Sequence, residues 1–292
     1  MKNKEHVITL IKEVARKYVD PAGREILVLD EASCREISQK CHISLREVHG
    51  TGLEQGIWPF RYVRNREILS QQEQKRLIES SVAVVGAGGL GGNVSLLLAR
   101  VGIGRIILLD QDVFDETNLN RQAGASLHSL GKPKAQETAR LILDVNPSVE
   151  VEARQVRITG DNAIQILHQI DVIVDALDNI PDRMLLQSIA KKLGTPFVHG
   201  ALAGFEGQVM AVLPGDPGLE LVYGNRGEVQ EPGSRPEAIL GVPPMTAAMV
   251  ACYQAMEVLK ILLQRGQLLR NKMLYLDLES GGAYIYKLSG GS

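Results

Sequence analysis

The stretch SVAVVGAGGLGG, residues 81–92, decides the fold. It begins with small and β-branched residues, which predict a buried strand, and it ends in closely spaced glycines. Gly86, Gly88 and Gly91 form the pattern G-x-G-x-x-G where the strand ends and a helix begins. Without a Cβ atom the chain can turn tightly and bring its N–H groups against a phosphate at the helix N-terminus. The stretch therefore predicts a nucleotide-binding α/β unit.

Beyond this stretch, apolar runs that predict strands alternate with segments of helical spacing. Strands are expected at 81–86, 105–110, 149–156, 171–177, 196–202 and 207–213, and helices near 90–101, 133–145, 161–169 and 181–193. Such alternation predicts an α/β fold with a Rossmann-like, mostly parallel sheet covered on both faces. After a long Gly- and Pro-rich loop at 214–244 comes an apolar helix at 245–264. Two final strands, 272–280 and 283–289, are expected to pair antiparallel.

Residues 1–60 predict a small, mostly helical N-terminal region. Short helices on either side of residues 42–44 have the spacing of a helix-turn-helix, with Ser44 as the N-cap of the second helix. The segment lacks a concentrated Lys/Arg face, which a helix in a DNA groove requires. A module that packs on the main domain is therefore favoured over a DNA-binding one.

The composition is that of a globular protein without a strong charge. Of 292 residues, 45% are hydrophobic and 23% charged, and the net charge is −2. This balance gives no electrostatic reason for nucleic acid or membrane as the main partner. No apolar run reaches the ~18 residues of a membrane span. Three cysteines without a CxxC pair favour a reducing, cytoplasmic setting.

The segments that follow the second strand distinguish a triphosphate site from a dinucleotide site. Asp110 follows Gly91 by 19 residues, where an acid binds ribose hydroxyls in either class. Beyond it lie NLNR (118–121), GKPK (131–134) and DALDN (175–179). Polyphosphate chemistry needs cations on the phosphates and a carboxylate for Mg²⁺, whereas hydride transfer does not. The set favours a nucleoside triphosphate.

Together GAGGLGG, LLDQDVFDETNLNRQ, GKPK and DALDN resemble the sulfur-carrier and ubiquitin-activating superfamily, specifically its MoeB/ThiF/HesA branch. The resemblance runs from Arg61 to Tyr286, about three quarters of the chain. It implies a ThiF-type adenylation domain over 61–292. Its implied activity is ATP-dependent adenylation of the C-terminal Gly-Gly carboxylate of a small β-grasp sulfur carrier of the ThiS/MoaD type, with Mg²⁺ and release of pyrophosphate. Such an enzyme is a nucleotidyltransferase.

The resemblance also implies roles for individual residues. The cofactor-binding set is Gly86, Gly88, Gly89, Asp110, Asn118, Arg121, Lys134, Asp178 and Asn179. In that set the glycines approach the α-phosphate, and Asp110 binds the ribose. Arg121 and Lys134, together with Asn118, reach the phosphates. Asp178 holds Mg²⁺.

Arg64 matches an arginine that the family donates across a dimer interface to the partner's ATP, so a homodimer is expected. The predicted catalytic residues are therefore Arg64, Arg121, Lys134 and Asp178.

The chain departs from the family pattern in its cysteines. Many relatives carry two zinc-binding CxxC pairs; here ELVYGNR (220–226) replaces the first and no second pair follows, so no zinc is expected. The crossover loop has no cysteine for thioester or persulfide chemistry, and Cys252 in the apolar helix is predicted to be a buried core residue. We expect the reaction to stop at the acyl-adenylate, with sulfur supplied by another protein.

Three alternatives are also compatible with the motifs. A tRNA-modifying cyclase of the same superfamily would activate a carboxylate on an RNA nucleoside, although the slightly acidic charge disfavours RNA. A vestigial nucleotide fold joined to the N-terminal region would be a DNA- or partner-binding protein rather than an enzyme. A nicotinamide dehydrogenase would share the glycine pattern. His199, at a strand end, is either a substrate contact or a structural residue.

Overall fold

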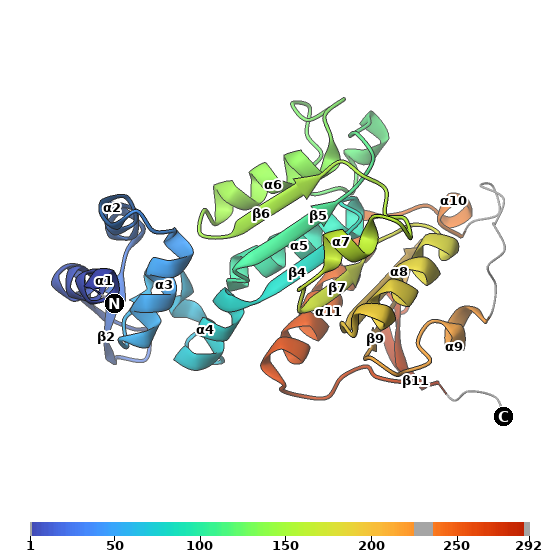
Figure 1. Ribbon diagram of the computed structural model, residues 1–292. Helices are drawn as coiled ribbons and strands as arrows, with labels where there is room; N and C mark the ends of the chain where they lie inside the picture. Colours follow the sequence, from blue (N-terminus) through green and yellow to red (C-terminus); the bar gives the residue numbers. More distant parts are fainter. Residues whose placement is uncertain (1, 225–235, 289–292) are drawn as a thin grey trace.

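A single eight-stranded sheet forms the centre of the protein in the computed structural model, which describes residues 2–224 and 236–288 (Figure 1). The strands are β4 (Ser81–Val85), β5 (Arg105–Leu109), β6 (Glu150–Arg154), β7 (Val172–Asp175), β8 (Phe197–Ala203), β9 (Glu206–Val212), β10 (Lys272–Asp277) and β11 (Gly282–Lys287). Their spatial order is β11-β10-β9-β8-β7-β4-β5-β6. The five strands from β4 to β8 pair in parallel, and β9, β10 and β11 continue the sheet antiparallel. The predicted α/β fold class is confirmed.

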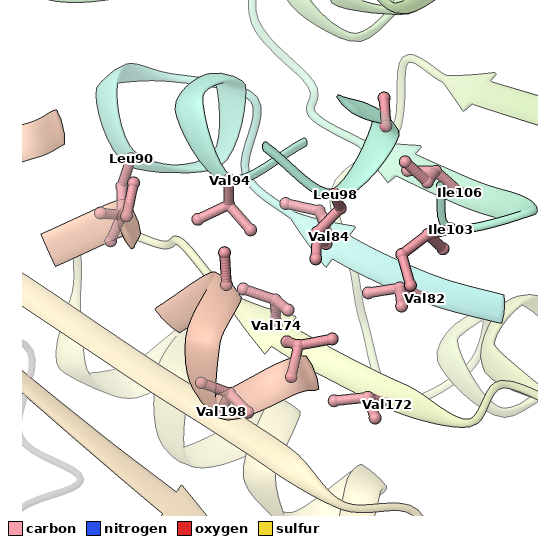
Figure 2. Packing of buried hydrophobic residues seen from close by; sticks show 14 of the residues in the cluster. Val82, Val84, Leu90, Val94, Leu98, Ile103, Ile106, Val172, Val174 and Val198 are labelled. Carbon is pink, nitrogen blue, oxygen red and sulfur yellow. The ribbon is translucent and has the colours of Figure 1, made fainter. Parts of the chain in front are cut away.

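Helices cover both faces of this sheet because successive residues of each strand point to opposite sides. One face packs against α5 (Gly89–Val101), α6 (Lys134–Val145) and α11 (Pro244–Leu263), and the other against α7 (Ala163–Leu167) and α8 (Ile180–Leu193). In β4, Val82 and Val84 face the first group, while Ala83 and Val85 face the second. Figure 2 shows the first layer, with Leu98 of α5 above the strand valines. Each fully buried valine or leucine stabilises the folded state by roughly 1.5–3 kcal/mol relative to an exposed side chain.

The chain changes direction across the sheet at β4. From β4 it runs outward through β5 and β6, then returns to β7 on the other side of β4. The turn after β4 is tied to both neighbours: the Gly86 N–H donates to the Leu109 carbonyl at 2.7 Å, and the Ala176 N–H donates to the Val85 carbonyl at 2.9 Å. The carboxyl ends of open parallel sheets form a ligand crevice at such a switch point.

The long helix α11 lies against α5, β8 and β9. By length and composition alone its 20 residues could span a membrane, but half of the window is buried inside the fold, as in a core helix. The prediction that Cys252 is buried is wrong, because its side chain is exposed. The helix is mostly apolar, and an exposed row formed by Met245, Met249 and Met256 accompanies Cys252 on its outer side.

The N-terminal region contains a small sheet as well as the predicted helices. Its elements are α1 (Lys2–Val14), β1 (Arg16–Val19), β2 (Glu25–Leu29), α2 (Glu31–Cys41), α3 (Leu45–Glu54) and β3 (Trp58–Pro59), with β1, β2 and β3 paired in that order. Ser44 caps α3 as predicted, in a capping box with Glu47. The two helices predicted on either side of residues 42–44 are therefore present as α2 and α3.

This region is packed against the main domain rather than standing free. The helix α3 contacts α4 (Gln71–Glu79), which leads into β4 (Figure 1). Arg46 of α3 donates to the carbonyl oxygens of Ile78 and Glu79 at 2.7 and 2.8 Å, at the C-terminal end of α4 where orphan carbonyls need donors. The second helix of the motif is thus partly covered by the chain itself.

Short helices occupy the predicted long loop and two further connections. They are the 3₁₀ helices η1 (Phe60–Asn65) and η2 (Glu116–Asn118), and the short α9 (Glu220–Tyr223) and α10 (Pro236–Leu240). Asp216, ahead of α9, is anchored to Arg270 at 2.7 Å. Residues 225–235 of the loop predicted at 214–244 lie outside the described residues.

Candidate active site

A cavity of about 460 Å³ lies at the carboxyl ends of the parallel strands, at the switch point beside β4. It brings together every residue of the predicted cofactor-binding set: Gly86, Gly88, Gly89, Asp110, Asn118, Arg121, Lys134, Asp178 and Asn179. Arg64 is exposed in η1 and is not among the described residues that line the cavity. Its predicted role across a dimer interface stays a prediction.

The glycines of the turn between β4 and α5 serve two different purposes. Gly86 has φ +97°, and a Cβ there would lie 2.5 Å from the Ala176 carbonyl oxygen, while a Cβ on Gly91 would lie 1.8 Å from the Gly86 oxygen. These two positions are required by the fold itself. At Gly88 and Gly89 a Cβ would meet nothing closer than 3.6 and 3.5 Å, and both residues line the cavity. Glycine at these positions leaves room for a ligand instead.

The N-terminus of α5 opens onto the cavity. Gly88 is the N-cap, and no side chain in the described part of the chain caps this helix. The N–H groups of a helix's first turn have no intrahelical acceptors, and the helix dipole favours a negative charge there. The uncapped end therefore offers an anion site of the kind that binds phosphate.

Asp110, at the end of β5, has its carboxylate fixed by two backbone donors. Its Oδ2 accepts from the Ala87 N–H at 2.7 Å, and its Oδ1 accepts from the Asp112 N–H at 2.8 Å. Burial raises the pKa of Asp110, and these two N–H bonds oppose that rise. The carboxylate is thus oriented at the wall of the cavity, where it can accept hydrogen bonds from hydroxyl groups.

Asn118 and Arg121 come from the predicted NLNR segment. Asn118 is buried, and its Oδ1 accepts from the Asp115 N–H at 3.0 Å, which closes a capping box over η2. Arg121 Nη1 donates to the Thr117 carbonyl and to Asn120 Oδ1, both at 2.8 Å. Both bonds lie within the loop, so they orient the guanidinium without neutralising its charge.

Lys134 begins α6 and supplies the second cation of the cavity. Its side chain is only 10% exposed, and its Nζ lies 3.2 Å from Asp112 Oδ2. Asp112 is 57% exposed, so solvent screens this pair and the interaction is weak. A buried ammonium with one exposed counter-charge can bind a phosphate oxygen in its place. Cations from two different elements therefore meet in one cavity with the glycine turn.

Asp178 and Asn179 form the turn between β7 and α8. Asn179, not Asp178, is the N-cap of α8, because its Oδ1 accepts from the Asp182 N–H at 2.9 Å. The Asn179 Nδ2 donates to Asp178 Oδ1 at 3.2 Å, so the cap also orients the neighbouring carboxylate. Asp178 itself is exposed to the cavity and lines it.

A magnesium ion bound together with nucleotide phosphates fits these residues. Among residues 2–224 and 236–288, no group of three or more His, Cys, Asp or Glu side chains could by itself hold a metal ion. Mg²⁺ usually keeps several waters and is bound through one or two carboxylates plus substrate phosphates. The oriented carboxylate of Asp178, in the same cavity as Arg121 and Lys134, matches that pattern.

Sequence reasoning missed several polar residues around the cavity. Arg157 pairs with Asp182 at 2.8 Å, and both line it, as does the buried Arg183. Asp182 and Arg183 lie in the first turn of α8, directly after DALDN, and this position was the available signal. His199, left open as a substrate contact, is buried and hydrogen-bonded within the protein, and it is not among the described residues that line the cavity.

Comparisons with known proteins identify the family of this chain. Residues 62–287 match the model of the ThiF family. The SAMP-activating enzyme E1 of Haloferax volcanii is 38% identical over 223 residues, covering 74% of this chain and 80% of that protein. The sulfur carrier protein adenylyltransferase of Thermus thermophilus is 38% identical over 211 residues, covering 70% and 77%.

Among solved structures, E. coli MccB with ATP has a similar fold. Its TM-score is 0.66 at 22% identity, over 79% of this chain and 71% of that one. The fold and the cavity define a nucleotide-binding α/β protein of the doubly wound class. The chain belongs to the ThiF family, and it is an adenylyltransferase of the MoeB/ThiF type, a nucleotidyltransferase.

Proposed function

We propose that the protein adenylates the C-terminal Gly-Gly carboxylate of a small ubiquitin-like sulfur carrier and releases pyrophosphate. The observation that carries the proposal is the meeting of Arg121, Lys134 and Asp178 in one cavity with an uncapped helix N-terminus. A dinucleotide site has no need of two phosphate cations opposite a carboxylate. The two named relatives are activating enzymes or adenylyltransferases of SAMP and of a sulfur carrier, which supports this substrate class.

In this proposal each part of the cavity meets one part of ATP. The N–H groups at Gly88 and Gly89 bind the α-phosphate, and Asp110 accepts from the ribose hydroxyls. Arg121 and Lys134, with Asn118, bind the phosphate oxygens. Asp178, oriented by Asn179, holds Mg²⁺, which supplies charge neutralisation on the phosphates when it is bound with ATP.

The chemistry requires positioning rather than a protein nucleophile. An oxygen of the carrier's carboxylate, already ionised at neutral pH, forms a bond to the α-phosphorus. The bond from that phosphorus to the bridging oxygen of the β-phosphate breaks, and pyrophosphate leaves with the electron pair. Negative charge grows on the leaving group, where Arg121 and Lys134 stabilise it.

A second cavity of about 190 Å³ adjoins the first and supports an extended, side-chain-free substrate end. The residues that line both cavities are Asp178, Arg183, Ala201, Leu202 and Glu237. A Gly-Gly terminus has no Cβ atoms, so its backbone can pass close to the side chains shared by the two cavities. The carboxylate would then reach the α-phosphate from the second cavity.

We further propose a homodimer, in which Arg64 of one subunit reaches the partner's ATP. Arg64 is exposed and outside its own chain's cavity lining, and the exposed methionines of α11 offer an apolar face for a second copy. Mixing Arg64→Ala with Arg121→Ala subunits tests this. Mixed dimers would regain one intact site and measurable exchange; a mixture as inactive as either variant alone would contradict the shared site.

Direct detection of the product tests the proposed reaction. The protein is incubated with ATP, Mg²⁺ and candidate Gly-Gly carriers, and the carriers are analysed by mass spectrometry. The expected result is the added mass of AMP on the intact carrier and none on a carrier lacking its last glycine. Adenylation of tRNA instead, or binding of NAD without ATP, would replace this function by one of the alternatives.

A further inference from the structure

Arg183 is a buried cation at the junction of the two cavities. Its side chain is 6% exposed and it lines both of them. Its Nε and Nη2 both donate to the Leu177 carbonyl oxygen, at 3.1 and 2.7 Å. Its Nη2 lies 3.8 Å from Glu237 Oε1, too far for a hydrogen bond. Two of the guanidinium nitrogens therefore bind the carbonyl group of Leu177, the residue directly before Asp178.

Beyond Arg183 a chain of hydrogen bonds runs through the half-buried Tyr223 to the buried pair of His199 and Asp175, and its protons can be assigned. The Tyr223 oxygen accepts from Arg183 Nη1 at 3.2 Å and from Gln208 Nε2 at 2.6 Å. These donors occupy both lone pairs, so the phenol proton goes to His199 Nε2, 3.1 Å away. His199 is then neutral and donates from Nδ1 to Asp175 Oδ2 at 2.7 Å. Burial lowers the pKa of His199, in agreement with a neutral ring.

The chain of bonds closes on the same turn from which it began. Asp175 Oδ1 accepts from the Leu177 N–H at 3.0 Å, while Arg183 holds the Leu177 carbonyl. Both polar groups of Leu177 are therefore held by one network. Its members come from β7, β8, β9, α8 and α9, so the turn before Asp178 is tied to five elements at once.

We propose that Arg183 and Tyr223, supported by His199 and Asp175, are positioning residues that fix the turn carrying Asp178. The inference rests on the proposed function, in which Asp178 holds the metal. Groups that orient a metal-binding carboxylate without touching the metal set its affinity, and their loss typically costs about 10–100-fold in metal affinity or activity. A network that holds both polar groups of Leu177 restricts the turn before Asp178, and with it the orientation of the carboxylate.

A double-mutant cycle with Tyr223→Phe and Asp178→Asn tests the proposal. Tyr223→Phe removes only a hydroxyl, and we expect it to weaken Mg²⁺ binding to the complex with a non-hydrolysable ATP analogue by about 10–100-fold, measured by calorimetry. ATP binding without metal should be unchanged. In the Asp178→Asn background the same change should cost less than about twofold, because the positioned group is already gone. Pyrophosphate exchange should follow the same pattern.

Two controls keep the outcomes separate. Tyr284→Phe, a half-exposed tyrosine on β11, should leave metal binding and exchange unchanged. If Tyr223→Phe does not fold, Arg183→Lys keeps the charge but loses the fork, and it is expected to behave as described for Tyr223→Phe. An equal loss in both backgrounds, or unchanged metal affinity, overturns the positioning role alone. No effect of Asp178→Asn itself would instead overturn the proposed metal site, and the positioning role with it.

Discussion

Two turns in this protein carry local signals for ligand binding, and tertiary packing decides which of them stays accessible to a ligand. The helix-turn-helix of α2 and α3 has its predicted cap at Ser44, yet Arg46 binds the end of α4 and the buried Val48 faces the protein interior. The glycine turn from β4 to α5 opens onto a cavity of about 460 Å³. A motif indicates what a backbone can bind, and whether it binds anything depends on what the rest of the chain leaves uncovered.

The largest expected effect comes from removing a cation at the open turn. Arg121→Ala or Lys134→Ala should lower the rate of ATP–pyrophosphate exchange by about 10²–10³-fold or more, because each would stabilise charge that develops on the leaving group. Circular dichroism should show an unchanged fold. Arg140→Ala is the matched control, on the exposed side of α6, and it should retain full exchange. Near-normal exchange in both cavity variants would remove the site assignment.

Glycines in the two regions should respond oppositely to an added methyl group. Gly91→Ala puts a Cβ 1.8 Å from the Gly86 oxygen, so the free energy of unfolding should fall by about 3 kcal/mol. Gly50 in α3 has nothing within 4 Å of such a Cβ, and Gly50→Ala should raise it by about 0.5–1 kcal/mol. Urea denaturation measures both. A stable, ATP-binding Gly91→Ala variant would contradict the close-packed turn.

The packing of the helix-turn-helix is tested through Arg46. Arg46→Ala removes two hydrogen bonds to carbonyls at the end of α4, and the free energy of unfolding should drop by about 1–3 kcal/mol. Arg35→Ala, an exposed residue paired with Glu31 on α2, should change it by less than about 0.5 kcal/mol. Equal stability of both variants, together with a DNA mobility shift by the wild-type protein, would mean that α3 is free to enter a groove.

Acid should lower the free energy of unfolding of the N-terminal region through His49 of α3. Burial lowers the pKa of His49 from 6.5 to about 3, and its Nδ1 has no hydrogen-bond partner among the described residues. Between pH 6.5 and about pH 3, His49 is protonated in the unfolded chain but neutral in the folded one. The free energy of unfolding therefore falls as pH falls, by up to about 1.4 kcal/mol per pH unit. His49→Phe should remove this part of the slope of unfolding free energy against pH. An identical slope in both proteins would contradict the buried neutral ring.

The strand and helix pattern, and the meeting of the predicted set in one cavity, were predictable because their signals are local. Alternation of apolar runs with helical spacing located β4 to β9, and the carboxyl ends of parallel strands necessarily meet at one edge. Asp110 was therefore placed at the cavity by its distance after the glycine turn, and Lys134 by the family motif GKPK at a helix start.

Features that depend on long-range register were not predictable. Tyr223 in α9 contacts His199 in β8 and Arg183 in α8. These three elements come together only in the folded chain, and no local sequence pattern indicates their contact. Cys252 lies on an apolar helix whose sequence does not reveal which side faces the core, and the structure exposes it. The sheet of β1, β2 and β3 pairs a two-residue strand that carries no periodic signal of its own.

Carrier dependence of ATP–pyrophosphate exchange tests the central claim most directly. Purified protein is mixed with ATP, Mg²⁺ and labelled pyrophosphate, either alone, with a Gly-Gly carrier, or with the same carrier lacking its final glycine. The account predicts label in ATP only with the intact carrier, and loss of that signal in Arg121→Ala. Exchange that is independent of the carrier, or that requires tRNA, would contradict it.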